Sequence, residues 1–247
     1  YVRDAYLRGL TLSEKGLTNP FKFGVVGSSD THVAGGSYTE ETHFSKIGLL
    51  DGEPYLRGSV PYEGFYGFFT KLLRPDSIVE VDGNNYLGVS ARLIRFGSSG
   101  LAGVWAEENT RESIYEAFRR KETFGTSGSR IKVRFFAGYD LEGSKLDDLS
   151  LIQDAYTNNA PMGGTIIQEK NNSPRFLVWA ISDPLGAPLQ RAQIIKGWLE
   201  DGEHREKVFD VACSDGLSVD PTTHRCPDNN AAVNLDDCSI SSDKGDS

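Results

Sequence analysis

The sequence predicts an α/β fold followed by a β-rich region, and three observations support this. An amphipathic helix over residues 2–10 precedes a short apolar strand, Phe23–Val26, which is the alternation expected of an α/β unit. A second and clearer helix covers residues 109–121. From about residue 131 onward the chain shows mainly strands and turns. The 247 residues are enough for one large domain, or for one domain with a smaller partner.

Composition and charge exclude two classes of partner. Apolar residues make up 38% of the chain and aromatic residues 11%, which is enough to build a core. The longest apolar run, Phe176–Ile181, is far too short to span a bilayer, so we predict no membrane partner. The net charge of −9 repels phosphate backbones, so we predict no nucleic-acid partner either.

The first predicted helix and strand indicate where a ligand site could lie. Val2, Ala5, Tyr6 and Leu10 share one helical face, and Gly16 can end the connection that follows. The strand Phe23–Val26 is almost wholly apolar, as expected of a strand covered on both faces. In α/β folds, ligands gather at the carboxyl ends of such strands.

Residues 33–100 form a long excursion that is rich in glycine and aromatic residues. An irregular segment directly after a candidate site is often a lid or a specificity loop. The alternative is a structural insertion packed by its own aromatic side chains. Composition alone leaves both possibilities open.

The helix over residues 109–121 has a start signal, an apolar stripe and an end signal. Asn109 can cap it, with Glu112 as the reciprocal partner three residues later. Its basic end, residues 119–121, suits the negative end of the helix dipole. The stripe expected to be buried consists of Ile114, Ala117 and Phe118.

Strands dominate the rest of the chain. Ile131, Val133 and Phe135 alternate with basic residues, which is typical of a half-buried strand. Further strands are predicted at Leu101–Trp105, at residues 176–182 and 190–198, and around Val208 and Val211. We expect domain boundaries at residues 1–130 and 131–240, with residues 241–247 disordered.

Asp30 and His32 are the strongest candidates for chemistry. They follow the apolar strand directly, and in extended backbone side chains i and i+2 point to the same side. A carboxylate and an imidazole are a donor pair that divalent metals accept. Two ligands do not complete a site, and the residues alone leave a hydrogen-bonded structural pair as the alternative.

Weaker candidates surround this pair. His43 could supply a ligand or shuttle a proton, or it could be a solvated loop residue. Glu107 could face the site, although adjacent carboxylates at a helix start are usually solvated. Thr126 and Ser127 could bind an anion, or they could simply form a glycine turn. We also count Arg111 among the candidate substrate-binding residues.

The three cysteines, Cys213, Cys226 and Cys238, lie in a polar stretch that cannot bury much apolar surface. A disulfide would help to hold such a stretch, and the odd count leaves one cysteine whose partner lies elsewhere. Free thiols, or a zinc site that also uses His224, are the alternatives. Gly-x-Ser-x-Gly and the glycine-rich phosphate loops do not occur in the sequence, which argues against a serine hydrolase or a nucleotide-binding protein.

Three blocks of the sequence resemble a large bacterial family known mainly as a domain of unknown function. The first block runs from Asn19 to His32. The second covers residues 100–111 and is extended by residues 119–128, and the third combines residues 196–198 with 210–216. That family looks like a branch of the PHP (polymerase and histidinol phosphatase) metallohydrolases. The resemblance covers most of residues 1–240.

The resemblance implies a distorted TIM-like barrel of the PHP type with a metal site at its strand ends. Its late Asp-x-His motif matches Asp30 and His32, while its early His-x-His motif does not occur here. We therefore expect residues 1–130 to be the later part of a barrel whose first half lies upstream, with an insertion at 33–100.

The resemblance also implies an activity. Two or three divalent ions, Zn, Mn or Fe, would activate a water that cleaves a small-molecule ester, most often a phosphoester. Asp30 and His32 would act as catalytic metal ligands, and this chain alone would be inactive without the upstream half. The family is often exported, which implies a periplasmic or secreted protein. The rival hypothesis is a non-catalytic β-rich module that binds a carbohydrate, a peptide or a partner chain.

Overall fold

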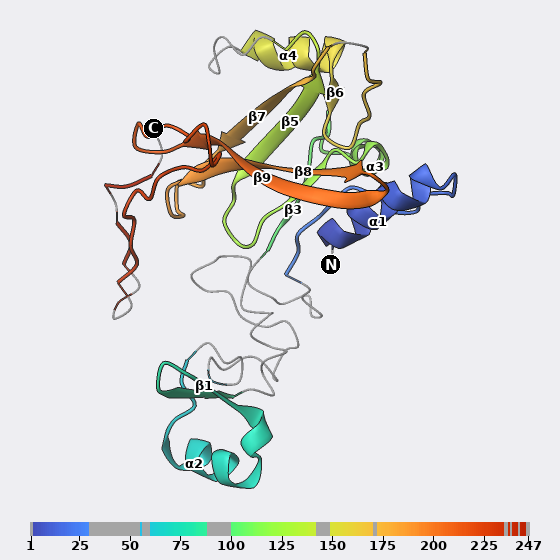
Figure 1. Ribbon diagram of the computed structural model, residues 1–247. Coiled ribbons are helices and arrows are strands. Elements are labelled where there is room, and N and C mark those ends of the chain that lie inside the picture. The colour runs from blue at the N-terminus through green and yellow to red at the C-terminus, as the bar shows by residue number, and fades with distance from the viewer. Residues whose placement is uncertain are drawn as a thin grey trace. The chain divides into compact units, whose positions relative to one another are not determined.

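The computed structural model describes residues 2–29, 55, 60–87, 100–141, 149–169, 172–234, 237, 239–241 and 243–245. The chain forms two compact units. Unit 1 contains residues 1–25, 104–123 and 131–247, and unit 2 contains residues 26–103 and 124–130. Figure 1 labels most helices and strands of both units.

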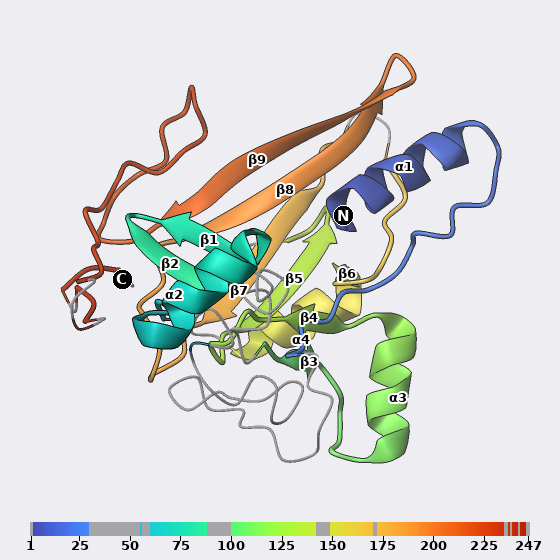
Figure 2. The same ribbon diagram turned by 90° about the horizontal axis from the view of Figure 1, so that it is seen from below.

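A long antiparallel hairpin is the largest element of unit 1. Strand β8 (Arg191–Glu200) pairs with β9 (Glu203–Cys213) along its whole length, with one irregularity between Ala192 and Gln193. Asp201 and Gly202 connect them, both at positive φ (53° and 78°), the geometry of a two-residue turn that matches strand twist. Helix α1 (Val2–Glu14) packs against both strands, as Figure 2 shows.

The apolar core of unit 1 lies under a small sheet of three strands. In this sheet β5 (Lys132–Gly138) is central and pairs antiparallel with β6 (Ala160–Pro161) and with β7 (Arg175–Ile181). Helix α4 (Leu149–Asn158) contacts β5 and β6. Phe136, 1% exposed, is the largest fully buried side chain described, and it packs with the residues Leu141, Ile152, Ala155 and Leu177.

Helix α3 (Arg111–Arg120) and strand β3 (Ala102–Val104) match the predicted positions closely, whereas strand β4 (Thr123–Gly125), which pairs with β3, was not predicted. The predicted cap is wrong, because Thr110 rather than Asn109 accepts the hydrogen bond of the first turn, from the backbone N–H of Ser113 at 3.3 Å. Lys121 ends the helix in the left-handed conformation (φ 63°). Ala117 is fully buried, but Phe118 is 46% exposed, so the predicted stripe is only partly correct.

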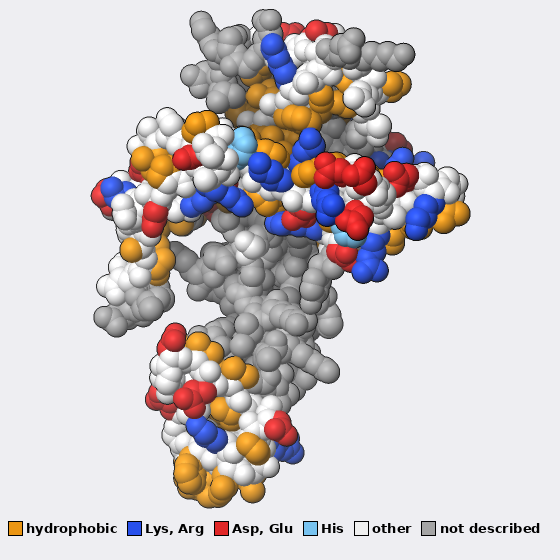
Figure 3. All heavy atoms as spheres, in the orientation of Figure 1, with side chains coloured by type: hydrophobic (Ala, Val, Ile, Leu, Met, Phe, Trp, Pro, Cys, Tyr) orange, Lys and Arg blue, Asp and Glu red, His pale blue; other side chains and the backbone are white. Residues whose placement is uncertain are grey.

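Within unit 2, α2 (Gly64–Leu73) is followed by a 3₁₀ turn, η3 (Pro75–Ser77), and by the hairpin of β1 (Ile78–Val81) and β2 (Asn84–Leu87). The aromatic rings of α2 contact one another, with the Phe65 and Phe69 ring centroids 4.6 Å apart. Several apolar side chains of α2 are nevertheless exposed, and they form the orange area at the lower end of Figure 3.

The predicted TIM-like barrel of the PHP type is wrong. Within the described residues the strands form small sheets of two or three strands, and the registers of the β1–β2, β5–β6, β5–β7 and β8–β9 pairs are all antiparallel. A barrel of α/β units needs parallel strands joined by helical crossovers and buried on both faces. Here most strands carry exposed positions, and two neighbouring pairs are joined by two-residue turns.

The predicted buried strand Phe23–Val26 is also wrong. These residues belong to no assigned strand, and Phe23, Val25 and Val26 are 40%, 42% and 53% exposed. Their apolar character predicted two covered faces, whereas the segment is held by a few specific contacts described below. In the described part of the chain, no helix has the length and apolar character that a membrane span requires.

Candidate functional site

The strongest sequence-predicted residues, Asp30, His32 and His43, lie outside the described residues. The structure does describe the segment that leads to them. Within unit 1, Thr123 Oγ1 donates a 2.7 Å hydrogen bond to the carbonyl of Val25. The chain just before the Asp-x-His motif is therefore fastened to β4.

Close backbone contacts continue this attachment within unit 2. A Cβ on Gly27 would lie 2.7 Å from the carbonyl oxygen of Thr126, and one on Gly125 would clash with the backbone N of Gly27. A Cβ on Gly100 would lie 3.0 Å from the same Thr126 oxygen. Only glycine allows three backbone segments to approach this closely. Residues 27–29, which directly precede Asp30, are thus fixed beside the predicted Thr126 turn.

The weaker candidates occupy different surroundings. Thr126 Oγ1 accepts hydrogen bonds from the backbone N–H groups of Leu101 (3.4 Å) and Gly128 (3.3 Å), so it stabilises its own turn. Ser127 is exposed, and so is Arg111 at the start of α3. Glu107 is exposed and lines a pocket of unit 1, and the lining of this pocket includes neither Thr126 nor Ser127.

Metal binding can be checked only for the described residues. Among them, no group of three or more His, Cys, Asp or Glu side chains is arranged to hold a metal ion. The described residues alone therefore supply no di- or trinuclear centre of the kind that the resemblance implies.

A pocket of about 500 Å³ lies in unit 1. Its polar and aromatic lining comes from the end of β3, the end of α3, β5 and α4. The side chains that define it are Trp105, Glu107, Arg120, Glu122, Arg134 and Tyr156. Its volume falls within the range of small-molecule sites.

Glu122 is the most unusual group of this pocket. Its side chain is only 4% exposed, and one carboxylate oxygen, Oε2, accepts a 2.8 Å hydrogen bond from Arg120 Nε. The other oxygen, Oε1, is buried without a hydrogen-bond partner in the described part of the protein. A buried carboxylate oxygen without a partner is costly, so a ligand group that reached Oε1 and donated a hydrogen bond would remove that cost.

Arg134 is held by aromatic rings. Its guanidinium carbon lies 3.7 Å from the ring centroid of Trp105 and 5.5 Å from that of Tyr156. Nη1 donates to the Tyr156 hydroxyl at 3.3 Å, whereas Nε is buried without a partner among the described residues. The Trp105 indole N–H donates to the carbonyl of Val133 at 2.8 Å, which fixes the ring that supports Arg134.

Tyr156 connects this pocket to the core. Its ring meets Phe136 edge-on, with centroids 4.9 Å apart. Burial, a hydrogen bond to the Glu122 carboxylate and the negative charge of that carboxylate raise the pKa of Tyr156 to about 12. The hydroxyl therefore stays protonated at neutral pH and can donate a hydrogen bond.

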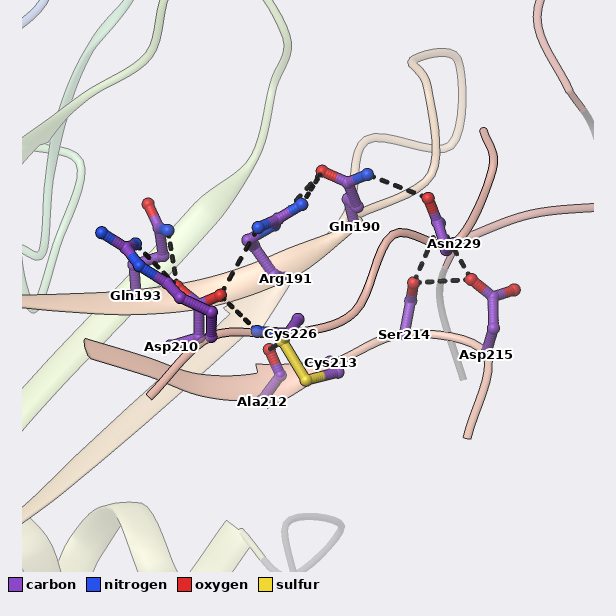
Figure 4. The surroundings of a disulfide bond; sticks show 11 residues. Gln190, Arg191, Gln193, Asp210, Ala212, Cys213, Ser214, Asp215, Cys226 and Asn229 are labelled. Atoms are coloured by element: carbon purple, nitrogen blue, oxygen red, sulfur yellow. Dashed lines mark hydrogen bonds and ion pairs between the residues drawn. A yellow bond between two sulfur atoms is a disulfide. The ribbon is translucent and has the colours of Figure 1, made fainter. Parts of the chain in front are cut away.

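A second polar cluster surrounds the disulfide bond between Cys213 and Cys226, shown in Figure 4. This bond confirms the predicted disulfide for two of the three cysteines, and Cys238 lies outside the described residues. The side chain of Asp210 is fully buried beside it and accepts hydrogen bonds from the Cys226 backbone N–H (2.7 Å) and Gln193 (2.6 Å). Asp210 also forms ion pairs with Arg191 and Arg225.

The residues after the disulfide are tied in the same way. Asn229 donates to both Ser214 Oγ (3.2 Å) and Asp215 (2.9 Å), and it accepts from Gln190 at 2.9 Å. Asp215 also accepts from the backbone N–H of Gly245 at 3.1 Å. Every polar group of this cluster named here has a protein partner, so we assign the cluster a structural role.

Comparison with known proteins gives one match. The family described as "Protein of unknown function (DUF3604)" matches residues 1–247, the whole chain. The chain belongs to DUF3604. No curated protein and no solved structure matches this DUF3604 chain.

The pocket of this DUF3604 chain was not predicted from its sequence, apart from Glu107. Glu122 follows a helix end, where a carboxylate is ordinarily solvated, and Arg134 lies on a strand face that reads as polar. The sequence signal that could have indicated the pocket was Trp105, an aromatic residue at the end of a predicted strand and a few positions before the charged residues Glu107, Glu108 and Arg111. Nothing in the sequence brings Tyr156, more than 20 positions beyond Arg134, to the same place.

Proposed function

We propose that this DUF3604 chain provides Asp30 and His32 to the metal site of a hydrolase that cleaves a small-molecule ester, most often a phosphoester. One observation carries the proposal. The Asp-x-His motif directly follows a segment that is fastened to Thr123 and packed against Thr126, so its entry point is fixed in space. A fixed entry point is what a metal ligand pair requires.

Asp30 and His32 together supply only part of a metal coordination sphere. Two side chains cannot fix a catalytic metal centre, so the proposed centre needs further ligands from residues outside this pair. Bound Zn, Mn or Fe would lower the pKa of a water and polarise the ester. A periplasmic or secreted location agrees with the Cys213–Cys226 disulfide, because such bonds persist in oxidising compartments.

Metal analysis of the full-length protein tests this function. We expect Asp30→Ala and His32→Ala each to lower the bound metal and the hydrolysis of p-nitrophenyl phosphate. His204→Ala is the matched control, since His204 is exposed on β9 and belongs to no described metal cluster. If metal content and hydrolysis remain at the level of the control in both variants, Asp30 and His32 are not ligands.

The second candidate function is a non-catalytic binding module formed by the β-rich unit 1. The observation that favours it is the pocket that contains the buried Glu122 carboxylate. In this case Asp30 and His32 form a structural pair. Binding of a small ligand that survives removal of all metal would favour the module.

A further inference from the structure

The pocket of unit 1 combines an acceptor and a donor that the described protein leaves unpaired. Glu122 Oε1 can only accept a hydrogen bond, and Arg134 Nε can only donate one. Both residues line the same pocket, and both atoms are buried. A ligand that satisfies both must carry donor and acceptor groups close together.

The charges of the lining narrow the ligand class. Glu107 and Glu122 oppose Arg120 and Arg134, so the formal charges of the lining cancel. An anionic ligand would meet the free oxygen of Glu122, and a cationic ligand would meet the guanidinium of Arg134. A balanced lining of this kind favours a neutral ligand.

Hydroxyl groups fit these requirements. Each hydroxyl both donates and accepts, so two adjacent hydroxyls can serve a carboxylate and a guanidinium at once. The Tyr156 hydroxyl, which shares a hydrogen bond with Arg134, lines the same pocket. Pro161 and Ala106 add apolar surface for carbon-bound hydrogens, and about 500 Å³ is room for a sugar of one or two rings.

We infer that this pocket binds a neutral polyhydroxyl compound, a sugar or a sugar alcohol, through Glu122 and Arg134. The inference rests on the second candidate function and specifies its ligand class. The polyol hydroxyls donate to Glu122 Oε1 and accept from Arg134 Nε. The ion pair between Arg120 and Glu122 holds the carboxylate in place for this contact.

Titration calorimetry on the metal-free protein tests the inference with D-glucose, D-mannitol, inorganic phosphate and methylammonium as probes. We expect a neutral polyol to bind saturably. Glu122→Gln removes a charged acceptor and should weaken polyol binding about tenfold, as expected for a hydrogen bond to a charged group. Arg134→Lys keeps the charge, removes the Nε donor and should also weaken binding.

Glu116→Gln is the matched control, because Glu116 makes the same charge change on the exposed side of α3 and does not line the pocket. Its polyol affinity should equal that of the wild type, and thermal unfolding shows whether each variant is folded. Binding of phosphate or methylammonium in place of the polyols overturns the ligand class but keeps the binding module. Absence of saturable binding by any probe, or equal polyol affinity in all variants, overturns the inference. Because no metal is present, none of these results depends on Asp30 and His32.

Discussion

Asp210 shows how one buried side chain organises its surroundings. It lies on β9, and its carboxylate joins β8, through Gln193 and Arg191, to the backbone of Cys226. The hydrogen bond from the Cys226 N–H, assisted by Gln193 and the two arginines, holds the pKa of Asp210 below its ordinary value of 3.8. The ionised form is therefore the one that the folded state stabilises.

This linkage predicts a pH effect. Because the pKa of Asp210 is lower in the folded state, its contribution to stability is present above about pH 4 and is lost as pH falls through the folded pKa. Asp210→Asn should lower the free energy of unfolding at pH 7 by about 2 kcal/mol, because the ionised acceptor is lost. The difference between variant and wild type should shrink in denaturant titrations carried out at increasingly acidic pH.

Asp201→Asn is the control for this experiment. Asp201 is exposed in a turn at positive φ, a conformation that asparagine adopts readily. Its free energy of unfolding should match the wild type at every pH. A loss in Asp210→Asn that is equally large at acidic pH would contradict the role assigned to the ionised carboxylate.

Residue patterns predicted several contacts and missed others. The polar stretch around the cysteines correctly predicted a disulfide, because such a stretch has little apolar surface to bury. The role of Asp210 could not be predicted, because its partners, Gln193 and Arg225, come from separate segments. The same reason hides Glu122 and Arg134, whose environment is set by packing and not by local pattern.

At the level of elements, the start of α3 separates two neighbouring candidates for the cap. Thr110→Ala should lower the free energy of unfolding of unit 1 by about 1 kcal/mol, because the Ser113 N–H loses its acceptor. Asn109→Ala, which alters the residue that the sequence favoured, should leave stability unchanged. Denaturant unfolding followed by circular dichroism measures both free energies. A larger loss of stability in Asn109→Ala than in Thr110→Ala would show that Asn109 is the cap.

The disulfide gives a second prediction at this scale. It closes a loop with a sequence separation of 13, and loss of such a constraint costs about 3 kcal/mol in chain-entropy terms. The double variant Cys213→Ser, Cys226→Ser should be less stable by that amount. Wild-type protein in reductant should match the variant, whose own stability should not respond to reductant. Equal stability of oxidised wild type and variant would rule out a stabilising bond.

Most elements of unit 1 were predicted near their observed positions. Alternation predicted β5, and apolar runs predicted β7 and β8, because side-chain period reports strand faces directly. Both hairpins turn at an Asp-Gly pair, at 82–83 and 201–202, and this pair is itself a strong local signal for a two-residue hairpin turn. Phe23–Val26 failed because an apolar run does not say what covers it.

For the whole molecule, the order of elements did not determine the architecture. A helix followed by an apolar run favoured parallel strands, yet the partner of each strand is set by turns and long-range packing. The prediction of a β-rich later region was correct, and the prediction of a barrel was wrong. The chain belongs to DUF3604, whose description names no activity, so the proposed function is inferred from the residues.

The stability of unit 1 depends on a small core. Phe136 is 1% exposed, and its removal should cost about 3–5 kcal/mol, comparable to the whole stability of many domains. Phe136→Ala should therefore lower the thermal midpoint sharply. Phe176→Ala, at a position that is 50% exposed on the neighbouring strand, should lower it much less. Equal shifts in scanning calorimetry would show that the core lies elsewhere.

The turn at Asp201 and Gly202 has a consequence for the order of assembly. The residues that pair between β8 and β9 lie at most 22 positions apart in sequence, from Arg191 with Cys213 down to Glu200 with Glu203, so this hairpin can form within microseconds. During synthesis it would already exist when Cys226 leaves the ribosome, 13 positions after Cys213. The disulfide would then form after the hairpin, and its oxidation could occur late and still stabilise the hairpin.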